Sequence, residues 1–372
     1  MAILYAVGDI APDRPDPKDC FALVRDRLRE GDIVFGQLET SITTRGSRLP
    51  QARHAVRGAP AVGPALKDAG FSIVSMAGNH CMDWGLEGFF DTLDALKAQG
   101  IAVVGAGADI AEARAPVIAE AGGAKVAFLA YSTILPMAYW AEARRAGCAP
   151  MRAHTLYEQI EHDQPGTPAR IHTFPHREDL QALVDDIRAA KAKADIVAVS
   201  LHWGIHFVPA VLADYQRDVA HAAIDAGADM ILGHHAHILK GVEVYLGKPI
   251  FYSLCNFATD LRMDKAHAES KSFKEIQTLN PNWIPDFDSL YNFPADSRMT
   301  AVIRAVIEDG ALKAVRLLPA FVNRDAQPEI LARADPRFNQ VLAYLEQISR
   351  DAGLSTRFEI DGDGIAVSEA AS

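Results

Sequence analysis

The sequence predicts an α/β fold, a four-layer α/β/β/α sandwich in which two stacked sheets lie between helices. Up to Gly241, short apolar runs alternate with segments of helical periodicity, which implies a layered α/β sheet. The runs are continuous rather than alternating, as expected for strands that are covered on both faces. After Gly241 the pattern changes to strands that look antiparallel. Two sheets packed between helices accommodate both patterns.

The chain before Gly241 supplies the alternating strands and helices. Continuous apolar runs predict buried strands at residues 2–7, 33–35, 71–77, 101–104, 125–130, 196–201 and 230–232. Apolar residues at helical spacing predict helices at residues 18–30, 85–99, 178–192 and 214–226.

The chain after Gly241 supplies the antiparallel strands and a terminal extension. Strands are expected at residues 242–245, 249–253, 300–307 and 314–320, the last two joined by a turn at residues 308–310. Asp335 and Pro336 are a good N-cap and first helical residue, so a helix is expected to run to about residue 350. A hairpin is expected at residues 358–367. We therefore expect one domain at residues 1–322 and an extension, residues 323–372, packed on it.

Two long segments interrupt this pattern, at residues 136–175 and 261–298. Both lack core periodicity, yet they carry Trp140, Trp283 and Tyr291. Long insertions of this kind usually form lids or contact surfaces. Their aromatic side chains are expected to cover the mouth of a pocket or to join two copies of the chain in a homo-oligomer.

Composition excludes several classes of function. The chain of 372 residues has 37 Lys and Arg against 48 Asp and Glu, a formal net charge of -11. Such a surface disfavours nucleic acid and anionic bilayers, so we expect a small-molecule or peptide substrate and neither nucleic-acid nor membrane partners. No run approaches the roughly 20 apolar residues of a membrane span, and residues 3–7 are too short for a signal peptide. We expect a cytoplasmic protein whose four cysteines are reduced.

Residues able to bind a metal follow five of the predicted strands. They are Asp9; Glu39; Asn79 with His80 and Asp83; His202 with His206; and His235 with His237. The carboxyl ends of strands gather the ligand site of an α/β sheet, so these side chains are expected to converge. On an extended backbone, the spacing of His235 and His237 would point both imidazoles to the same side. This set of donors suits a divalent Mn, Fe, Zn or Co ion.

Six short motifs occur in order along the chain. They are Gly8-Asp9, Gln37-Leu38-Glu39, Gly78-Asn79-His80 with Asp83-Trp84-Gly85, His202-Trp203-Gly204, Gly233-His234-His235-Ala236-His237 and Tyr252-Ser253-Leu254-Cys255-Asn256-Phe257. Together they resemble the CapA (poly-γ-glutamate capsule synthesis) family, an offshoot of the calcineurin-like metallophosphoesterases. The resemblance implies a metallophosphoesterase-like sandwich with a metal site between its sheets.

The resemblance also implies a role for each residue of the motifs. By position, Asp9 and His237 would bind a first metal, Glu39 would take the place of the bridging carboxylate, and Asn79, His202 and His235 would face a second metal. His80 matches the histidine that acts as general acid in the phosphoesterases.

Four positions depart from the pattern that the resemblance implies. Ala11 stands where the phosphoesterases have a histidine, and Glu39 replaces their bridging aspartate. With one ligand missing, we expect one tightly held metal rather than a full pair. His206 and Cys255 replace the acidic residue and the glycine usual in the family, which points to a different substrate.

These features predict a metal-dependent hydrolase that cleaves an amide, with γ-glutamyl as one candidate, or a phosphoester bond. The metal would polarise a carbonyl or phosphoryl oxygen and activate water, while His80 or His206 moves a proton. Asp83 either fixes the tautomer of His80 or caps the following helix. Cys255 has no base near it in the sequence, so a packed thiol is expected. Two alternatives stay open: a non-hydrolytic acid/base enzyme such as a peptide epimerase or a lyase, and a non-catalytic binding protein.

Overall fold

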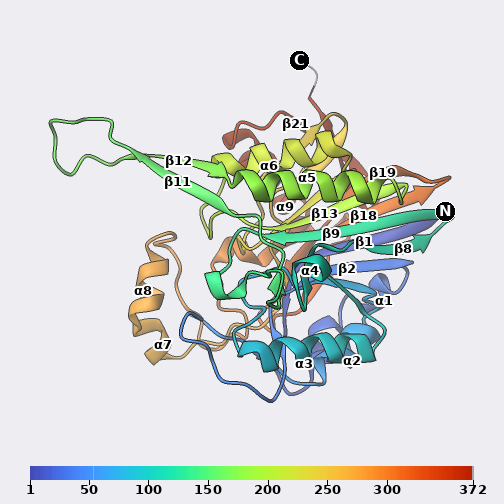
Figure 1. Cartoon of the computed structure of the whole chain (residues 1–372), viewed down its shortest axis with the longest axis horizontal. Helices are drawn as coiled ribbons and strands as arrows, with labels where there is room; N and C mark the ends of the chain where they lie inside the picture. Colours follow the sequence, from blue (N-terminus) through green and yellow to red (C-terminus); the bar gives the residue numbers. More distant parts are fainter. Residues whose placement is uncertain (53, 371–372) are drawn as a thin grey trace.

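Two β-sheets form the centre of the fold in the computed structural model, which describes residues 1–52 and 54–370 (Figure 1). The larger sheet has ten strands, in the order β21 (Thr356–Asp361), β22 (Gly364–Glu369), β19 (Ala311–Val322), β18 (Met299–Glu308), β1 (Ala2–Ala11), β2 (Ile33–Leu38), β5 (Ile73–Ser75) and β6 (Ala102–Val104), with β17 (Asn256–Thr259) beside β1 and β20 (Pro328–Ile330) beside β19. The smaller sheet has six strands, in the order β15 (Val242–Tyr245), β16 (Lys248–Phe251), β14 (Met230–His234), β13 (Ile196–His202), β9 (Ala124–Ser132) and β8 (Val117–Ala121).

Helices cover the outer faces of both sheets. In Figure 1, α2 (Val62–Asp68) and α3 (Gly85–Ala98) lie along one side of the strands, and α5 (Arg177–Lys191) and α6 (Asp214–Ala226) lie along the other. The four-layer α/β/β/α sandwich predicted from the sequence is therefore confirmed. We find no helix with both the length and the hydrophobicity of a membrane span in residues 1–52 and 54–370.

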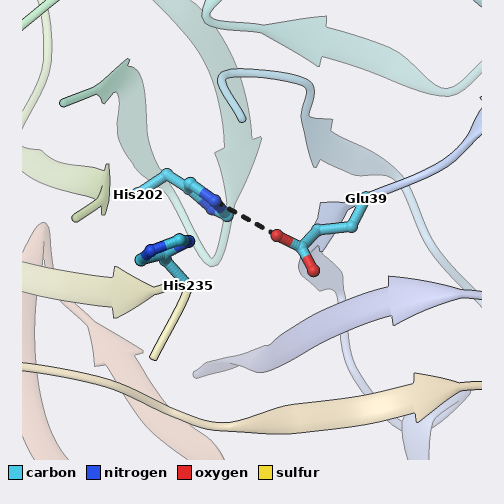
Figure 2. A group of neighbouring side chains, drawn as sticks. All are labelled: Glu39, His202 and His235. Atoms are coloured by element: carbon cyan, nitrogen blue, oxygen red, sulfur yellow. Dashed lines mark ion pairs between the residues drawn. The ribbon is translucent and has the colours of Figure 1, made fainter. Parts of the chain in front are cut away.

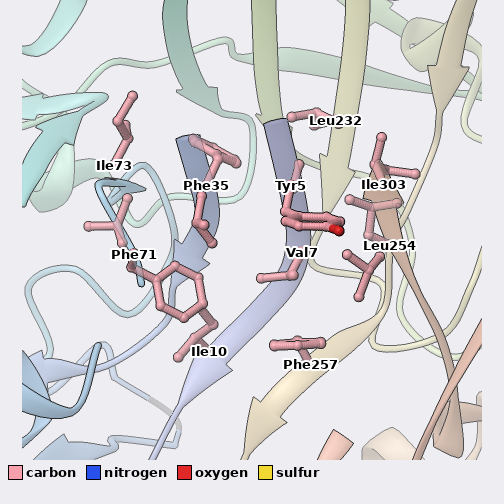
Figure 3. Packing of buried hydrophobic residues seen from close by; sticks show 14 of the residues in the cluster. Tyr5, Val7, Ile10, Phe35, Phe71, Ile73, Leu232, Leu254, Phe257 and Ile303 are labelled. Carbon is pink, nitrogen blue, oxygen red and sulfur yellow. The ribbon is translucent and has the colours of Figure 1, made fainter. Parts of the chain in front are cut away.

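The core between the two sheets consists of apolar side chains from both of them. Phe35 of β2 stacks on Phe128 of β9 with ring centroids 5.3 Å apart, so the two sheets are in direct contact. Figure 3 shows part of this core, with Tyr5 and Val7 of β1 among its members. A second buried cluster fills the space between the smaller sheet and helices α5 and α6. Burial on both faces explains why the strand sequences are continuously apolar.

Strand β1 changes its neighbour at Gly8. Residues Ala2 to Ala6 pair with β18, whereas Asp9 to Ala11 pair with β17. At the change, the backbone N–H of Asp9 donates to the carbonyl oxygen of Cys255 over 3.0 Å. A Cβ atom on Gly8 would lie 1.9 Å from that oxygen, so only glycine permits the approach. This exchange of neighbours places the Asp9 side chain at the ends of the strands.

Several predicted elements differ in detail from the structure. The helix expected at residues 18–30 is a 3₁₀ turn, Pro17–Phe21, followed by the short helix α1 (Arg25–Leu28). The same apolar positions are buried in both arrangements, so the pattern did not distinguish them. Within residues 136–175, which showed little periodicity, β11 (Ala153–Glu158) and β12 (Arg170–Pro175) form a hairpin that projects from the molecule (Figure 1).

The segment at residues 261–298 contains two short helices, α7 (Lys265–Glu269) and α8 (Lys271–Gln277). Trp283 is buried, and its ring lies 4.9 Å from that of Phe207 and 5.0 Å from that of Phe273. Tyr291 is also fully buried within the chain. The side chains of Trp283 and Tyr291 are thus covered by this chain's own residues.

The C-terminal residues join the larger sheet. Helix α9 (Pro336–Asp351) begins after Asp335, whose carboxylate accepts a hydrogen bond from the backbone N–H of Arg337. Strand β22 pairs with β19, and β21 forms the edge of the sheet beyond it. The larger sheet therefore continues through residues on both sides of position 322.

Candidate metal centre

Five of the sequence-predicted ligands meet where strands of both sheets end. Asp9 lies in β1 and Glu39 directly follows β2, both in the larger sheet. His202 is the last residue of β13, and His235 and His237 follow β14, both strands of the smaller sheet. Four of these side chains are buried, and His237 keeps 12% of its side-chain surface exposed. The sandwich thus brings together residues that are distant in sequence, as expected for strand ends.

One group of donors consists of Glu39, His202 and His235, which Figure 2 shows around a common point. Their ligand atoms all lie within 4.8 Å of one another. Nε2 of His202 is 3.1 Å from Oε1 of Glu39 and 2.7 Å from Oδ1 of Asn79. Asn79, which follows β5, therefore points its amide oxygen at the same place.

A second group of donors consists of Asp9, Glu39 and His237, again within 4.8 Å of one another. Nε2 of His237 is 4.0 Å from Oε2 of Glu39, and its Nδ1 is 3.8 Å from Oδ2 of Asp9. Glu39 belongs to both groups, one oxygen facing each. The arrangement offers two adjacent positions for a metal ion that share the Glu39 carboxylate. From the absence of a histidine at position 11, one tightly held metal was expected.

The donor chemistry fits a divalent transition metal. Nδ1 of His235 is buried and has no hydrogen-bond partner among the described residues. Burial, together with the charges of Asp9 and Asp83, raises the pKa of Glu39 well above its usual range. Burial also holds the pKa of His235 well below its usual value, so the imidazole stays neutral and keeps a lone pair for a ligand bond. A cation between these groups would offset the cost of burying the carboxylates.

His235 and His237 were expected on an extended backbone that would point both imidazoles to the same side, and this expectation is wrong. Strand β14 ends at His234, and both residues have left-handed backbone conformations, with φ of 87° and 54°. Such conformations are costly for residues other than glycine and concentrate at functional sites. The two imidazoles reach different donor groups because the loop folds back, and not because an extended strand aligns them.

Asn256 orients His237, a role that the sequence did not reveal. Its Oδ1 lies 2.7 Å from Nδ1 of His237, so Nδ1 carries the proton and Nε2 is left for a ligand bond. Its Nδ2 donates to the hydroxyl of Tyr291 over 2.9 Å, and that hydroxyl donates to the carbonyl of Ser297. The one sequence feature that could have indicated this role is that Asn256 lies in one of the six motifs that also carry the metal donors. The segment at residues 261–298 is thereby connected to the donors.

Asn256→Leu is expected to weaken Mn²⁺ binding about 10–100-fold, the usual cost of losing a partner that orients a metal ligand. Asn256→Asp, which keeps an acceptor at Oδ1, is expected to retain most of the affinity. Competition with a fluorescent chelator measures both variants. Equal affinities for Asn256→Leu and the parent would show that His237 needs no such partner.

His80 and Asp83 form a hydrogen-bonded pair at the edge of the donors. Nδ1 of His80 lies 2.7 Å from Oδ2 of Asp83, and the hydroxyl of Tyr139 donates to Oδ1 of Asp83 over 3.2 Å. The cap of helix α3 is Trp84, with no side-chain cap bond, so of the two roles considered for Asp83 the structure supports the partner of His80. Because a carboxylate only accepts, His80 donates from Nδ1 and keeps Nε2 free. Tyr139 was not anticipated from the sequence.

His206 lies against the donors on the side of the smaller sheet. Its ring centroid is 3.9 Å from that of His235 and 5.2 Å from that of His237. Burial and neighbouring imidazoles hold the pKa of His206 well below its usual value. Lys240 anchors the loop that carries His206, because its Nζ donates to the carbonyl oxygens of residues 208 and 211. Burial lowers the pKa of Lys240 to about 7.

Cys255 is a packed thiol, as expected. Its side chain is fully buried, and its Sγ–H donates to the carbonyl oxygen of Ser297 over 3.2 Å. Burial raises the pKa of the Cys255 thiol well above its usual range, which keeps it protonated. It does not line the cavity described next.

A cavity of about 780 Å³ opens from the donors toward the segment at residues 261–298. Glu39, His80, His206 and His235 line it, together with residues from α7 and α8 and with Trp283. The volume suits a ligand of several hundred daltons, since such sites usually measure about 300–1,000 Å³. Ala11 also lines the cavity, at the position of the missing ligand.

The chain resembles curated proteins of capsule synthesis. It is 31% identical over 243 residues to the PGA biosynthesis protein CapA of Bacillus subtilis (strain 168), covering 64% of this chain and 56% of that protein. It is 32% identical over 196 residues to the capsule biosynthesis protein CapA of Bacillus anthracis, covering 53% of this chain and 42% of that protein. The chain thus spans about half the length of these relatives.

A solved structure described as a novel phosphatase from Mycoplasma pneumoniae aligns with a TM-score of 0.44 at 13% identity, over 91% of this chain and 96% of that one. Residues 3–261 match the family described as bacterial capsule synthesis protein PGA_cap. Since that match includes most of the chain and all the donors described above, the protein belongs to the bacterial capsule synthesis protein (PGA_cap, CapA) family.

Proposed function

We propose that the protein is a metal-dependent hydrolase that cleaves an amide bond, with a phosphoester as the alternative substrate. The observation that supports this most strongly is that Glu39, which lines the cavity, is shared between two donor groups. A divalent cation held there would polarise a carbonyl or phosphoryl oxygen and lower the pKa of water toward neutrality. The names of the relatives, which refer to polyglutamate and capsule synthesis, support a γ-glutamyl amide as one candidate.

The chain's own residues supply the remaining chemistry. Asp9, Glu39, Asn79, His202, His235 and His237 would hold the metal. His80, oriented by Asp83, lines the cavity, where it would protonate a leaving group. Tyr139 fixes Asp83 in turn. Groups held in this way donate a proton without first having to reorganise.

A second candidate is a proton-shuttling enzyme, such as a peptide epimerase. The observation that favours it is the presence of two imidazoles on one cavity: His80 comes from the larger sheet's side and His206 from the smaller sheet's side. Two acid/base groups approaching from different elements suit removal and return of an α-proton.

Both candidates are tested on the full chain loaded with Mn²⁺, Zn²⁺, Fe²⁺ or Co²⁺. γ-Glutamyl amides, peptides and phosphoesters are supplied in H₂O and in D₂O, with Glu39→Gln as the control lacking the shared ligand. Metal-dependent cleavage of an amide is the expected result. Deuterium incorporation without cleavage would replace the hydrolase by the epimerase, and the absence of any metal-dependent change would contradict both.

A further inference from the structure

Neither lysine nor arginine occurs among the described residues that line the cavity. The ionisable side chains there are five histidines and four carboxylates, the latter being Glu39, Asp83, Asp260 and Glu275. Asp260 is neutralised by Arg14, which is bonded to it in a buried ion pair. Asp83 is bonded to His80, and Glu39 is a metal ligand in the proposed function. Glu275 is paired with Lys271, which lies outside the described lining. Beyond the metal position, the described lining therefore offers an anionic ligand neither a lysine nor an arginine.

The walls beyond the metal position are largely apolar. The lining includes Leu261, Met263, Phe273 and Ile276, which belong to a hydrophobic cluster completed by Trp283. Residues 134–136, Ile-Leu-Pro, follow strand β9 and line the same cavity. Leu279 also lines it and keeps 43% of its surface exposed. Surfaces of this kind bind uncharged apolar groups.

We infer that the substrate carries an uncharged, apolar peptide or acyl group beside the reacting bond, and is not a polyanionic chain of γ-linked glutamates. This inference rests on the proposed function for the position of the reacting bond. A chain of glutamates would place a carboxylate at each residue against an apolar wall. This is unfavourable because those carboxylates would lose water without gaining a lysine or arginine partner from the described lining. An apolar group would displace water from the same wall at no such cost.

Ligand binding is measured at pH 8 with the Mn²⁺-loaded full chain, using the fluorescence of Trp283. The two probes are N-acetyl-Leu-Leu amide and tri-γ-glutamate, and a Trp283→Phe protein identifies the signal. The Leu-Leu amide is expected to bind at least tenfold more tightly than tri-γ-glutamate. Equal or tighter binding of tri-γ-glutamate would overturn the inference.

A matched pair of variants tests whether the cavity wall sets this preference. Leu279→Lys adds a cation to the wall, and Ile284→Lys adds the same charge to a residue of the same segment that is 85% exposed and outside the described lining. Leu279→Lys is expected to reduce the preference at least threefold, and Ile284→Lys to leave it unchanged. An unchanged preference in Leu279→Lys would overturn the inference.

The two proposals fail in different ways. Preferential binding of the Leu-Leu amide with no cleavage of any amide would leave the inference standing and contradict the hydrolase. Efficient cleavage of γ-glutamyl chains, with no binding of the Leu-Leu amide, would support the hydrolase and overturn the inference.

Discussion

Glu39→Gln is expected to abolish metal binding at both donor groups, because Glu39 is the ligand that they share. Loss of an outer partner costs about 10–100-fold in affinity, so loss of a shared charged ligand is expected to cost more than about 100-fold. His235→Ala removes a ligand from one group only, so it is expected to retain up to one metal per chain. Elemental analysis of the purified proteins gives the number of metal ions per chain for each variant.

Glu39→Gln is also expected to stabilise the metal-free protein at high pH. Burial and two neighbouring carboxylates raise the pKa of Glu39, so the folded state favours its protonated form. The stability that this group contributes is present at low pH and is lost as the pH rises through the raised pKa. At pH 8, metal-free Glu39→Gln is therefore expected to exceed the metal-free parent by about 0.5–2 kcal/mol in unfolding free energy.

Chemical denaturation at pH 5 and pH 8, with and without Mn²⁺, measures the unfolding free energies. Mn²⁺ is expected to raise the unfolding free energy of the parent only. Glu39→Gln is expected to be more stable than the parent only when metal is absent. His221→Ala serves as the control, since His221 contacts Glu243 and Tyr245 rather than the donors. A Glu39→Gln protein that holds as much metal as the parent would reject the shared-ligand assignment.

His80→Gln is expected to reduce turnover about 10²–10⁴-fold while the protein keeps its metal, since general acids contribute rates of that size. His80 lines the cavity and belongs to neither donor group, which separates its role from that of the ligands. Steady-state rates at saturating substrate and metal content are measured on the same preparation. Asp83→Asn is expected to lower the rate less, by about tenfold to a hundredfold, because His80 keeps its imidazole and loses the carboxylate that orients it.

His206→Gln is the comparison that decides which histidine moves the proton. His206 contacts His235, so its loss is expected to alter metal affinity as well as rate. Full activity in metal-loaded His80→Gln, together with loss of activity in His206→Gln, would assign proton transfer to His206.

The layers of the fold were predictable because burial of a strand determines which of its residues are apolar. Strands β9 and β13 are buried on both faces, so their sequences are continuously apolar and bounded by turns. The ends of these strands then identified the places where His202 and its neighbours gather. The hairpin of β11 and β12 left no such signal, because most of its residues are exposed on both faces.

The contacts that orient the donors could not be predicted. Asn256 meets His237, and Tyr139 meets Asp83, through a fold that brings distant segments together, and neither pairing has a local pattern. The positive φ angles of His235 and His237 depend on the packing of the loop after β14, which composition does not encode. Sequence thus indicated which residues gather, and the structure supplied the partners that hold them.

The exchange of neighbours along β1 sets the order in which the protein can mature during synthesis. Asp9 leaves the ribosome well before the residues that its strand pairs with, which are residues 256–259 and strand β18. At about 5–20 residues per second, they follow after roughly 12–60 s. Until then β1 has an open edge, a surface that other chains can pair with. A product truncated at residue 261, although it spans the family match, would therefore retain that open edge along the residues that pair with β18.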